Sequence, residues 1–329
     1  MTWLAKSIMH TRGVAGGKVR QTHELSEHRQ GEFQYTIGPY SNPVLRIEPG
    51  DRIIVETVDT FGGAIRTEVD FPTQKLRAPF LNPQSGPIVV EGATKGDVLA
   101  AYLESIVPRG RNPRGTVCMI PNFGGLTGTH YTATLNEPLP ERVKKVNVDE
   151  TSVYWSDTLI LPYRPHVGVI GCSPEIESIT TLAADSHGGN MDIPDIAPGS
   201  ITYLPVNSPG ARLFIGDAHA CQGDGELCGN GVEIASETTI HVDLIKDWQI
   251  SWPRLENEEL IMAIGSARPL EDATRIGYRE LVRWMESDYG FGRWDAYMIL
   301  GQSGIVRLGN LVDPKYSVGA AIKKRYLAR

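Results

Sequence analysis

The sequence predicts a mainly β fold, made of mixed but largely antiparallel β-sandwich or barrel units, with an α+β part at the C-terminus. Two observations support this prediction. The 35 glycines and 22 prolines are spread along the chain and not concentrated in a linker, as expected for many short strands joined by turns. Helical periodicity is clear only near the C-terminus.

Strands are expected in three places. Residues 44–58 contain two apolar runs around a Pro49-Gly50-Asp51 turn, because Pro presets the backbone for a turn and Gly adopts the unusual φ that follows. A second Gly-Asp turn precedes an apolar run at 98–106. Residues 238–250 alternate apolar and polar side chains, which is typical of a strand with two different faces.

The C-terminal part predicts a helix over about 272–289, with Asp272 as its N-cap and Gly290 as its C-terminal left-handed residue. A short helix is expected after Trp294-Asp295, followed by a strand over 304–308 that Pro314 terminates. We divide the chain into an N-terminal β-rich domain, 1–160, and a β/α+β domain, 161–329, with the two halves closely packed.

Composition excludes several classes of function. A formal charge of -7 argues against nucleic acid as a partner, because phosphate binding relies on clustered Lys and Arg. No stretch approaches the run of about 18 apolar residues that a membrane helix needs, so no membrane is expected. The four cysteines, at 118, 172, 221 and 228, show no C-x-x-C spacing, and no signal peptide is visible. We therefore expect a cytoplasmic protein.

Polar residues concentrate between 187 and 233. In Asp217-Ala218-His219 the carboxylate and the imidazole are two residues apart, so on an extended chain they point to one face and can converge on a cation. Taken alone, such a pair is more often a surface hydrogen bond. His187-Gly-Gly-Asn-x-Asp192 is most simply a turn, although Asp192 could supply another ligand and Asn190 a contact to substrate.

The densest polar stretch, Gln222 to Glu226, has a tight acidic turn as its simplest interpretation. A calcium loop is a weaker alternative, because the usual D-x-D-x-D-G spacing is absent. Two polar stretches between apolar strands nevertheless favour function, since buried polar groups need partners.

These stretches resemble the acetamidase/formamidase family. The resemblance covers roughly residues 40–320 and includes GGNMD at 188–192, GDAHACQGDGE at 216–226, NPQSGPIVVEGA at 82–93 and HVGVIG at 166–171. It implies a homodimer or larger homo-oligomer, a small linear amide such as formamide or acetamide as substrate, and a bound divalent metal. Zinc is expected ahead of calcium. A cyclic amide such as a γ-lactam is an alternative substrate.

Site residues follow from matching the family motifs. The metal ligands are then Asp192, Asp217 and His219, and the general base is Glu226 or Glu233. Asn190 and Gln222 lie beside them, His166 supports the site, and the turn from His187 to Gly189 could offer donors to a developing oxyanion. We hypothesise that one glutamate deprotonates a metal-activated water that attacks the amide carbon, then protonates the departing ammonia.

Two other mechanisms stay open. Cys221 or Cys118 could act as a nucleophile, although a thiol of this kind is more often a small apolar filler. The chain could instead be a β-rich binding protein in which a metal only braces a turn. Against this second alternative, structural zinc sites usually use four ligands, often thiolates, whereas these motifs are rich in carboxylates.

Overall fold

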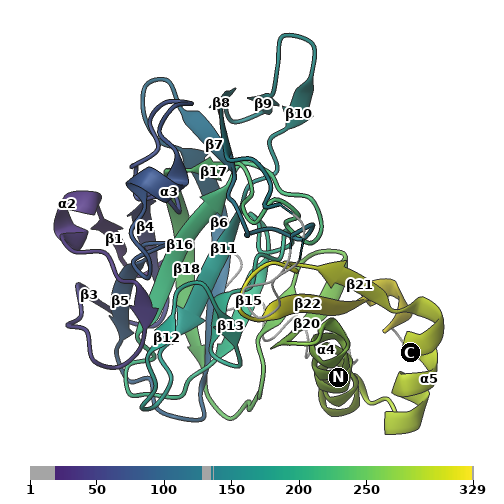
Figure 1. Ribbon diagram of the computed structural model, residues 1–329. Helices are drawn as coiled ribbons and strands as arrows, with labels where there is room; N and C mark the ends of the chain where they lie inside the picture. Colours follow the sequence, from purple (N-terminus) through teal and green to yellow (C-terminus); the bar gives the residue numbers. More distant parts are fainter. Residues whose placement is uncertain (1–18, 128–134, 136, 328–329) are drawn as a thin grey trace.

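Two large β-sheets form the body of the protein, and a pair of helices packs on one of them (Figure 1). The computed structural model describes residues 19–127, 135 and 137–327. Strands greatly outnumber helices, and most strand pairs are antiparallel, with parallel pairing of β1 to β4 and of β3 to β5. The predicted mainly β, largely antiparallel fold with C-terminal helices is confirmed.

The first sheet has nine strands and takes in both ends of the described chain. Its order is β1 (Thr22–Leu25), β4 (Asp51–Thr57), β18 (Ser236–Ile245), β6 (Val98–Pro108), β15 (Ile201–Pro205), β19 (Arg254–Glu256), β20 (Leu260–Ala267), β22 (Tyr316–Lys323) and β21 (Ile305–Leu308). The strands expected after Pro49-Gly50-Asp51 and after Gly96-Asp97 are therefore present as β4 and β6.

The second sheet has eleven strands and holds most of the polar motifs. Its main path is β10 (Ile160–Pro162), β9 (Ser152–Tyr154), β8 (Arg142–Val148), β7 (Arg114–Met119), β17 (Glu233–Ile234), β16 (Leu213–His219), β11 (His166–Cys172), β14 (Gly188–Asn190) and β13 (Ala184–Asp185). Two further strands extend it, β5 (Ser85–Val90) on β16 and β3 (Leu45–Ile47) on β5. A separate small sheet pairs β12 (Ile179–Thr180) with β2 (Thr36–Ile37).

The helices are α2 (Glu27–Gln30), α3 (Pro72–Lys75), α4 (Leu270–Tyr289), α5 (Arg293–Ser303) and a 3-10 turn, η1 (Lys324–Tyr326). The long helix ends as predicted, with Gly290 at φ 63°, ψ 19°. The predicted N-cap is wrong. Pro269 occupies that position, and Asp272 lies inside the first turn, where its charge favours the positive end of the helix dipole. Pro314 lies beyond the end of β21 at Leu308.

The main hydrophobic core lies between the two sheets. It joins fully buried side chains of the first sheet, such as Ile53 and Leu103, to others of the second, such as Ile170 and Ile215. A second core lies between the first sheet and α4, around Trp284. Burying one such side chain contributes about 1.5–3 kcal/mol, so the two cores hold the sheets and helices together.

The expected boundary between residues 160 and 161 separates strands that pair in the same sheets. In the first sheet β6 pairs with β15 and β18, and in the second β5 pairs with β16. The division into 1–160 and 161–329 stays a prediction, and residues 1–18 of its first part lie outside the described residues.

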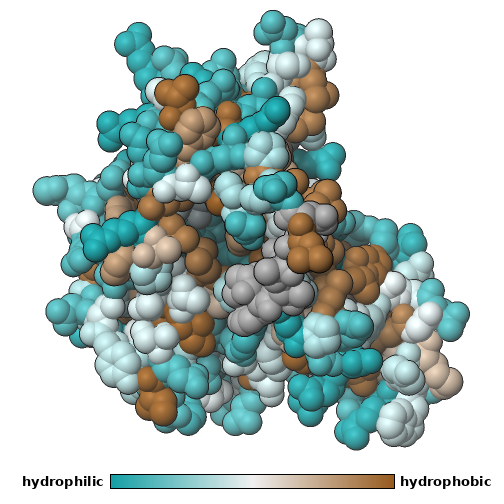
Figure 2. Space-filling model, viewed as in Figure 1, coloured by the Kyte–Doolittle hydropathy of each residue, from teal (hydrophilic) through white to brown (hydrophobic). Residues whose placement is uncertain are grey.

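None of the helices that the structure describes is long and apolar enough to cross a membrane. On the face drawn in Figure 2, hydrophilic and hydrophobic residues are interspersed. Surface polarity alone therefore does not mark a site, whereas the interior contains an unusual group of charged side chains.

Candidate active site

A row of polar residues crosses five adjacent strands of the second sheet. His219, the last residue of β16, is paired with His166 of β11 on one side and with Glu233 of β17 on the other. Glu233 is paired in turn with Thr116 of β7, and Thr116 with Lys145 of β8. Directly opposed residues on neighbouring strands share a face of the sheet, so the pairing itself assembles the row.

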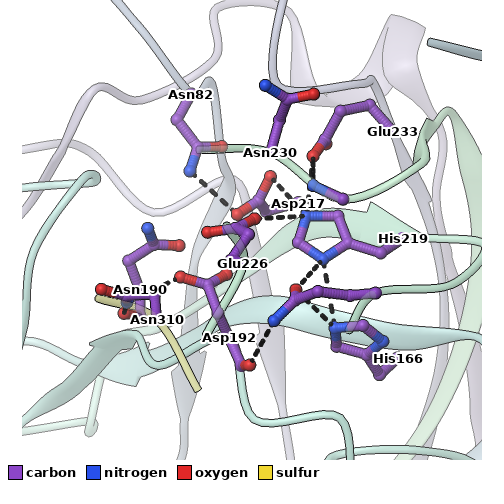
Figure 3. Close-up of polar contacts among 12 residues, drawn as sticks. Asn82, His166, Asn190, Asp192, Asp217, His219, Glu226, Asn230, Glu233 and Asn310 are labelled. Atoms are coloured by element: carbon purple, nitrogen blue, oxygen red, sulfur yellow. Dashed lines mark hydrogen bonds and ion pairs between the residues drawn. The ribbon is translucent and has the colours of Figure 1, made fainter. Parts of the chain in front are cut away.

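Four acidic side chains surround the His219 ring (Figure 3). From Nε2 the distances are 3.0 Å to Glu233 Oε1, 3.5 Å to Asp217 Oδ1 and 3.8 Å to Glu226 Oε1. Asp192 completes the group. The four carboxyl groups and the imidazole are between 0% and 5% exposed, so the cluster is buried.

Two overlapping sets within this cluster could hold a metal ion. One consists of Asp192, His219 and Glu226, and the other of Asp217, His219 and Glu233; within each set the ligand atoms lie within 4.8 Å of one another. The structure thus places all three predicted ligands in the cluster, but distributes them over two sets that also include both predicted base candidates. Proximity alone does not separate ligand from base.

The backbone around these carboxylates departs from regular β geometry. Asp192, Asp217 and Glu226 have φ values of 48°, 57° and 51°, in the left-handed region that non-glycine residues seldom adopt. Asp217 therefore reaches His219 through a local distortion of β16, not through the regular alternation that the sequence suggested. Opposite it, Gly168 leaves the space: a Cβ there would stand 2.5 Å from Asp217 Oδ2 and would also meet Asp192.

Neutral donors from distant segments hold three of the carboxylates in place. Asn82 Nδ2 donates to Asp217 Oδ2 at 3.0 Å, and Asn310 Nδ2 donates to Asp192 Oδ2 at 2.9 Å. The Gly231 backbone N–H donates to Glu233 Oε1 at 2.9 Å. Sequence reasoning missed the roles of Asn82 and Asn310. Asn82 opens one of the family motifs, but no local pattern marks Asn310.

Gln222 determines the tautomer of His219. Its Nε2 donates to the backbone carbonyls of Asp192 (2.9 Å) and Gly309 (3.0 Å), so its Oε1 must face the imidazole as an acceptor. His219 Nδ1 lies 2.8 Å from that oxygen and therefore carries a proton. This arrangement leaves Nε2, the nitrogen that faces the carboxylates, with its lone pair available to a metal. His166 Nε2 also contacts Gln222 Oε1, at 3.0 Å, which gives His166 the supporting position expected for it.

Several buried polar atoms of the cluster have no hydrogen-bond partner among the described residues. They are Asp192 Oδ1, Asp217 Oδ1, Glu233 Oε2 and His219 Nε2. Leaving such atoms unpaired is expensive, and gathering four carboxyl groups around one imidazole adds like-charge repulsion. A divalent cation would satisfy the free oxygens and the nitrogen together. The donor atoms thus fit a metal ion, and a mixed histidine–carboxylate set suits zinc better than an all-oxygen calcium site.

The pKa shifts express the same imbalance. Burial, together with the nearby Asp217, raises the pKa of Asp192 to about 7. Burial likewise raises the pKa of Glu233 to about 8, and raises the pKa of Glu226 well above its usual range, with Asp192 adding to the effect. Burial also disfavours the charged form of Asp217, but the His219 charge and the Asn82 hydrogen bond outweigh it and lower the pKa. The cluster lacks positive charge.

The segment that begins at His187 is not the turn that the sequence suggested. Gly188–Asn190 forms β14, which pairs with β11 on one side and β13 on the other, because two glycines with φ near 90° let the chain pass between them. The Asn190 N–H donates to Ala183 O in this pairing. A three-stranded arrangement leaves little backbone free to stabilise an oxyanion.

His187 and Asn190 differ in their surroundings. Burial lowers the pKa of His187 to about 4, and the charged groups that act on it are Asp185 and Lys315, not the carboxylate cluster. Asn190 borders the cluster: its Nδ2 donates to Asp313 Oδ2 at 2.8 Å, while its buried Oδ1 has no partner among the described residues. Asp313 is another residue that sequence reasoning missed.

The two cysteines considered as nucleophiles are poorly suited to that role. Burial raises the pKa of Cys118 to about 12, and it also raises the pKa of Cys221. Cys118 packs in an apolar cluster with Phe61 and Ile65, and Cys221 packs against the main core. Since the thiolate is the nucleophile, both side chains are better described as small apolar fillers.

Together the fold and the site define a β-rich protein that buries a histidine–carboxylate cluster fitted to a divalent cation. The sequence model of the Acetamidase/Formamidase family matches residues 20–180 and 175–314. The chain belongs to this family.

Known relatives agree with this assignment. A crystal structure of acetamidase from Yersinia enterocolitica is 64% identical, with a TM-score of 0.95 over 99% of each chain. A predicted acetamidase/formamidase from Thermoanaerobacter tengcongensis is 28% identical, with a TM-score of 0.84 over 93% of this chain and 97% of that one. A putative formamidase of Schizosaccharomyces pombe is 27% identical over 260 residues. That match spans 61% of the length of the curated relative.

Proposed function

We propose that this protein is a metal-dependent amidase that hydrolyses small linear carboxamides, such as formamide and acetamide, to a carboxylate and ammonia. The observation that supports this most is the set of unpartnered, buried ligand atoms around His219. Membership of a family whose similar members are named acetamidase and formamidase supports the substrate class.

Asp192, Asp217 and His219 are the proposed metal-holding residues, and zinc is the proposed ion. Each of the two aspartates reaches the cluster with one oxygen anchored by an asparagine and the other unpartnered. When bound, a divalent cation supplies a Lewis acid that polarises the amide carbonyl and lowers the pKa of water to about 7. Calcium would need more oxygen ligands than this cluster offers beside an imidazole.

Glu226 is the proposed general base. The described residues donate no hydrogen bond to its carboxyl group, and at 5% exposure it is the least buried acid of the cluster. It is thus freer than the others to take a proton from water and to pass it to the departing ammonia. Glu233 is held by the Gly231 N–H and lies 3.0 Å from His219 Nε2, which suits a fixed ligand or a support for His219.

Asn190 is the proposed contact to the substrate amide. Its Oδ1 is an unpartnered, buried acceptor, and its Nδ2 is occupied by Asp313, so the side chain presents the oxygen in a fixed orientation. A primary amide brings N–H donors that such an oxygen can accept. Because His187 interacts with Asp185 and Lys315, we give it no step in the reaction. A cytoplasmic location and a homo-oligomer belong to the same proposal and rest on the sequence alone.

Ammonia release from formamide, acetamide, propionamide and a γ-lactam, before and after chelation and metal re-addition, tests the proposal. Release from the linear amides that stops on chelation and returns with zinc is the expected result. Turnover of the γ-lactam alone would replace the substrate class. Activity indifferent to chelation, or metal binding without release from any amide, would refute a metal-dependent amidase.

A further inference from the structure

A groove of about 510 Å³ lies between α4 and α5, and the reaction proposed above does not use it. Figure 1 shows the two helices beside β20 and β22, with α5 on the outer side of the molecule. Nine residues line the groove: Thr274, Arg275, Tyr278, Arg279, Val282, Arg283, Arg293, Trp294 and Tyr297. Its volume lies within the range of small-molecule sites.

The charge of this groove is opposite to that of the chain. Four of its lining residues are arginines and none is acidic, although acidic residues outnumber basic ones in the sequence, 39 to 32. Arg275, Arg279 and Arg283 recur at every fourth position and form one row along α4. Like charges at this spacing weaken a helix, so helix stability does not account for the row.

The arginines are only partly neutralised by neighbours. Arg275 lies 2.7 Å from Asp272, and Arg293 lies 3.1 Å from Glu286. Arg279 forms no side-chain hydrogen bond or ion pair with the part of the chain that the structure describes. A guanidinium group without a partner at the middle of the row is free to bind an anion.

Exposed aromatic rings stand opposite this row. Trp294 and Tyr297 of α5 are 72% and 67% exposed, and Tyr278 faces the groove from α4. Rings of this size are usually buried, and two of them one helical turn apart offer flat apolar surface beside cations. A planar ring can stack on such surfaces, and guanidinium groups can bind an acidic group attached to it.

A second copy of the chain fits this groove poorly. In a twofold dimer the same patch meets itself, so the four arginines would face four arginines. We propose instead that the groove binds a small planar organic anion, namely an aromatic ring that bears a carboxylate, sulfonate or phosphate group. This proposal is independent of the proposed amidase activity.

Titration of the full-length protein with the fluorescent dye 8-anilinonaphthalene-1-sulfonate tests the site. We expect saturable binding that Trp294→Ala and Arg279→Glu each weaken by about tenfold, because each removes a stacking surface or a cation. Arg46→Glu, an exposed arginine on β3, is the matched control and should leave the affinity unchanged. Unchanged affinity in both groove variants would refute the proposal.

Displacement of the dye distinguishes the ligand classes. Benzoate should displace it well, whereas acetate, which has the charge without the ring, and benzyl alcohol, which has the ring without the charge, should not. Equal displacement by acetate would overturn the planar-ring proposal in favour of a simple anion site. If sedimentation shows a dimer that Trp294→Ala dissociates, the groove is an interface between copies and the proposal is wrong.

Discussion

The cluster around His219 and the groove between α4 and α5 both concentrate charge, but in opposite ways. The cluster is acidic and buried, and neighbouring side chains or N–H groups anchor most of its carboxyl groups. The groove is basic and exposed, and its central Arg279 has no partner within residues 19–127, 135 and 137–327. Burial makes uncompensated charge expensive, whereas solvent screens it. Excess charge in the cluster therefore demands a bound cation, whereas excess charge in the groove only permits an anion.

Replacing the proposed base should have the largest effect on the buried side of this comparison. We expect Glu226→Gln to lower kcat for acetamide by about 10²–10⁴-fold, the contribution typical of general acid–base catalysis, because the amide cannot accept the proton. Metal content should be unchanged. The matched variant Glu233→Gln should instead weaken metal binding, and the reverse result would exchange the two roles.

Helix α4 allows the same comparison on two faces of a single element. Its inner face buries Glu280, which accepts two hydrogen bonds from Arg254 at 2.8 and 3.1 Å. Breaking such a buried pair costs about 3–5 kcal/mol, so Glu280→Ala should lower the free energy of unfolding by that amount. On the outer face, Arg279→Ala should change it by no more than about 0.5 kcal/mol. Similar values for both in chemical denaturation would show that burial does not control the difference.

The anchors of the cluster should have smaller effects than its ligands. Asn310→Ala removes the only side-chain amide that donates to Asp192 Oδ2 among the described residues. Outer partners of metal ligands typically contribute about 10–100-fold, so zinc affinity should fall by that factor. Asn147→Ala, an exposed asparagine on β8, should have no effect. An equal loss in both variants, measured by competition with a chelator, would contradict the assigned role of Asn310.

Thiol modification should have the smallest effect. Because burial raises the pKa of Cys118 to about 12 and also raises that of Cys221, iodoacetamide at about pH 8 should react with neither. The exposed Cys228 should be alkylated in the same sample, which mass spectrometry can verify. Activity should persist. Inactivation that parallels modification of Cys221 would restore the thiol as a nucleophile.

Sequence predicts best what local pattern encodes. The end of α4 at Gly290 and the strands after two Gly-Asp turns depend on residues next to one another, and Asp217 and His219 lie in one glycine-rich string. Asn82 and Asn310 lie 135 and 118 residues from the carboxylates that they hold, so only the pairing of strands reveals them. The groove escaped notice because its arginines resemble the solvated face of an ordinary amphipathic helix.

Metal content is the most direct test of the central claim that the His219 cluster holds a divalent cation. After chelation and dialysis against zinc, the wild-type protein should retain the metal, whereas Asp217→Asn and His219→Ala should lose it. Asp224→Asn is the matched control, since Asp224 belongs to the same motif but is 53% exposed and pairs with Arg307 at the surface. We predict that this variant retains zinc as the wild type does. Retention of zinc by both ligand variants, or its loss from Asp224→Asn as well, would contradict the account.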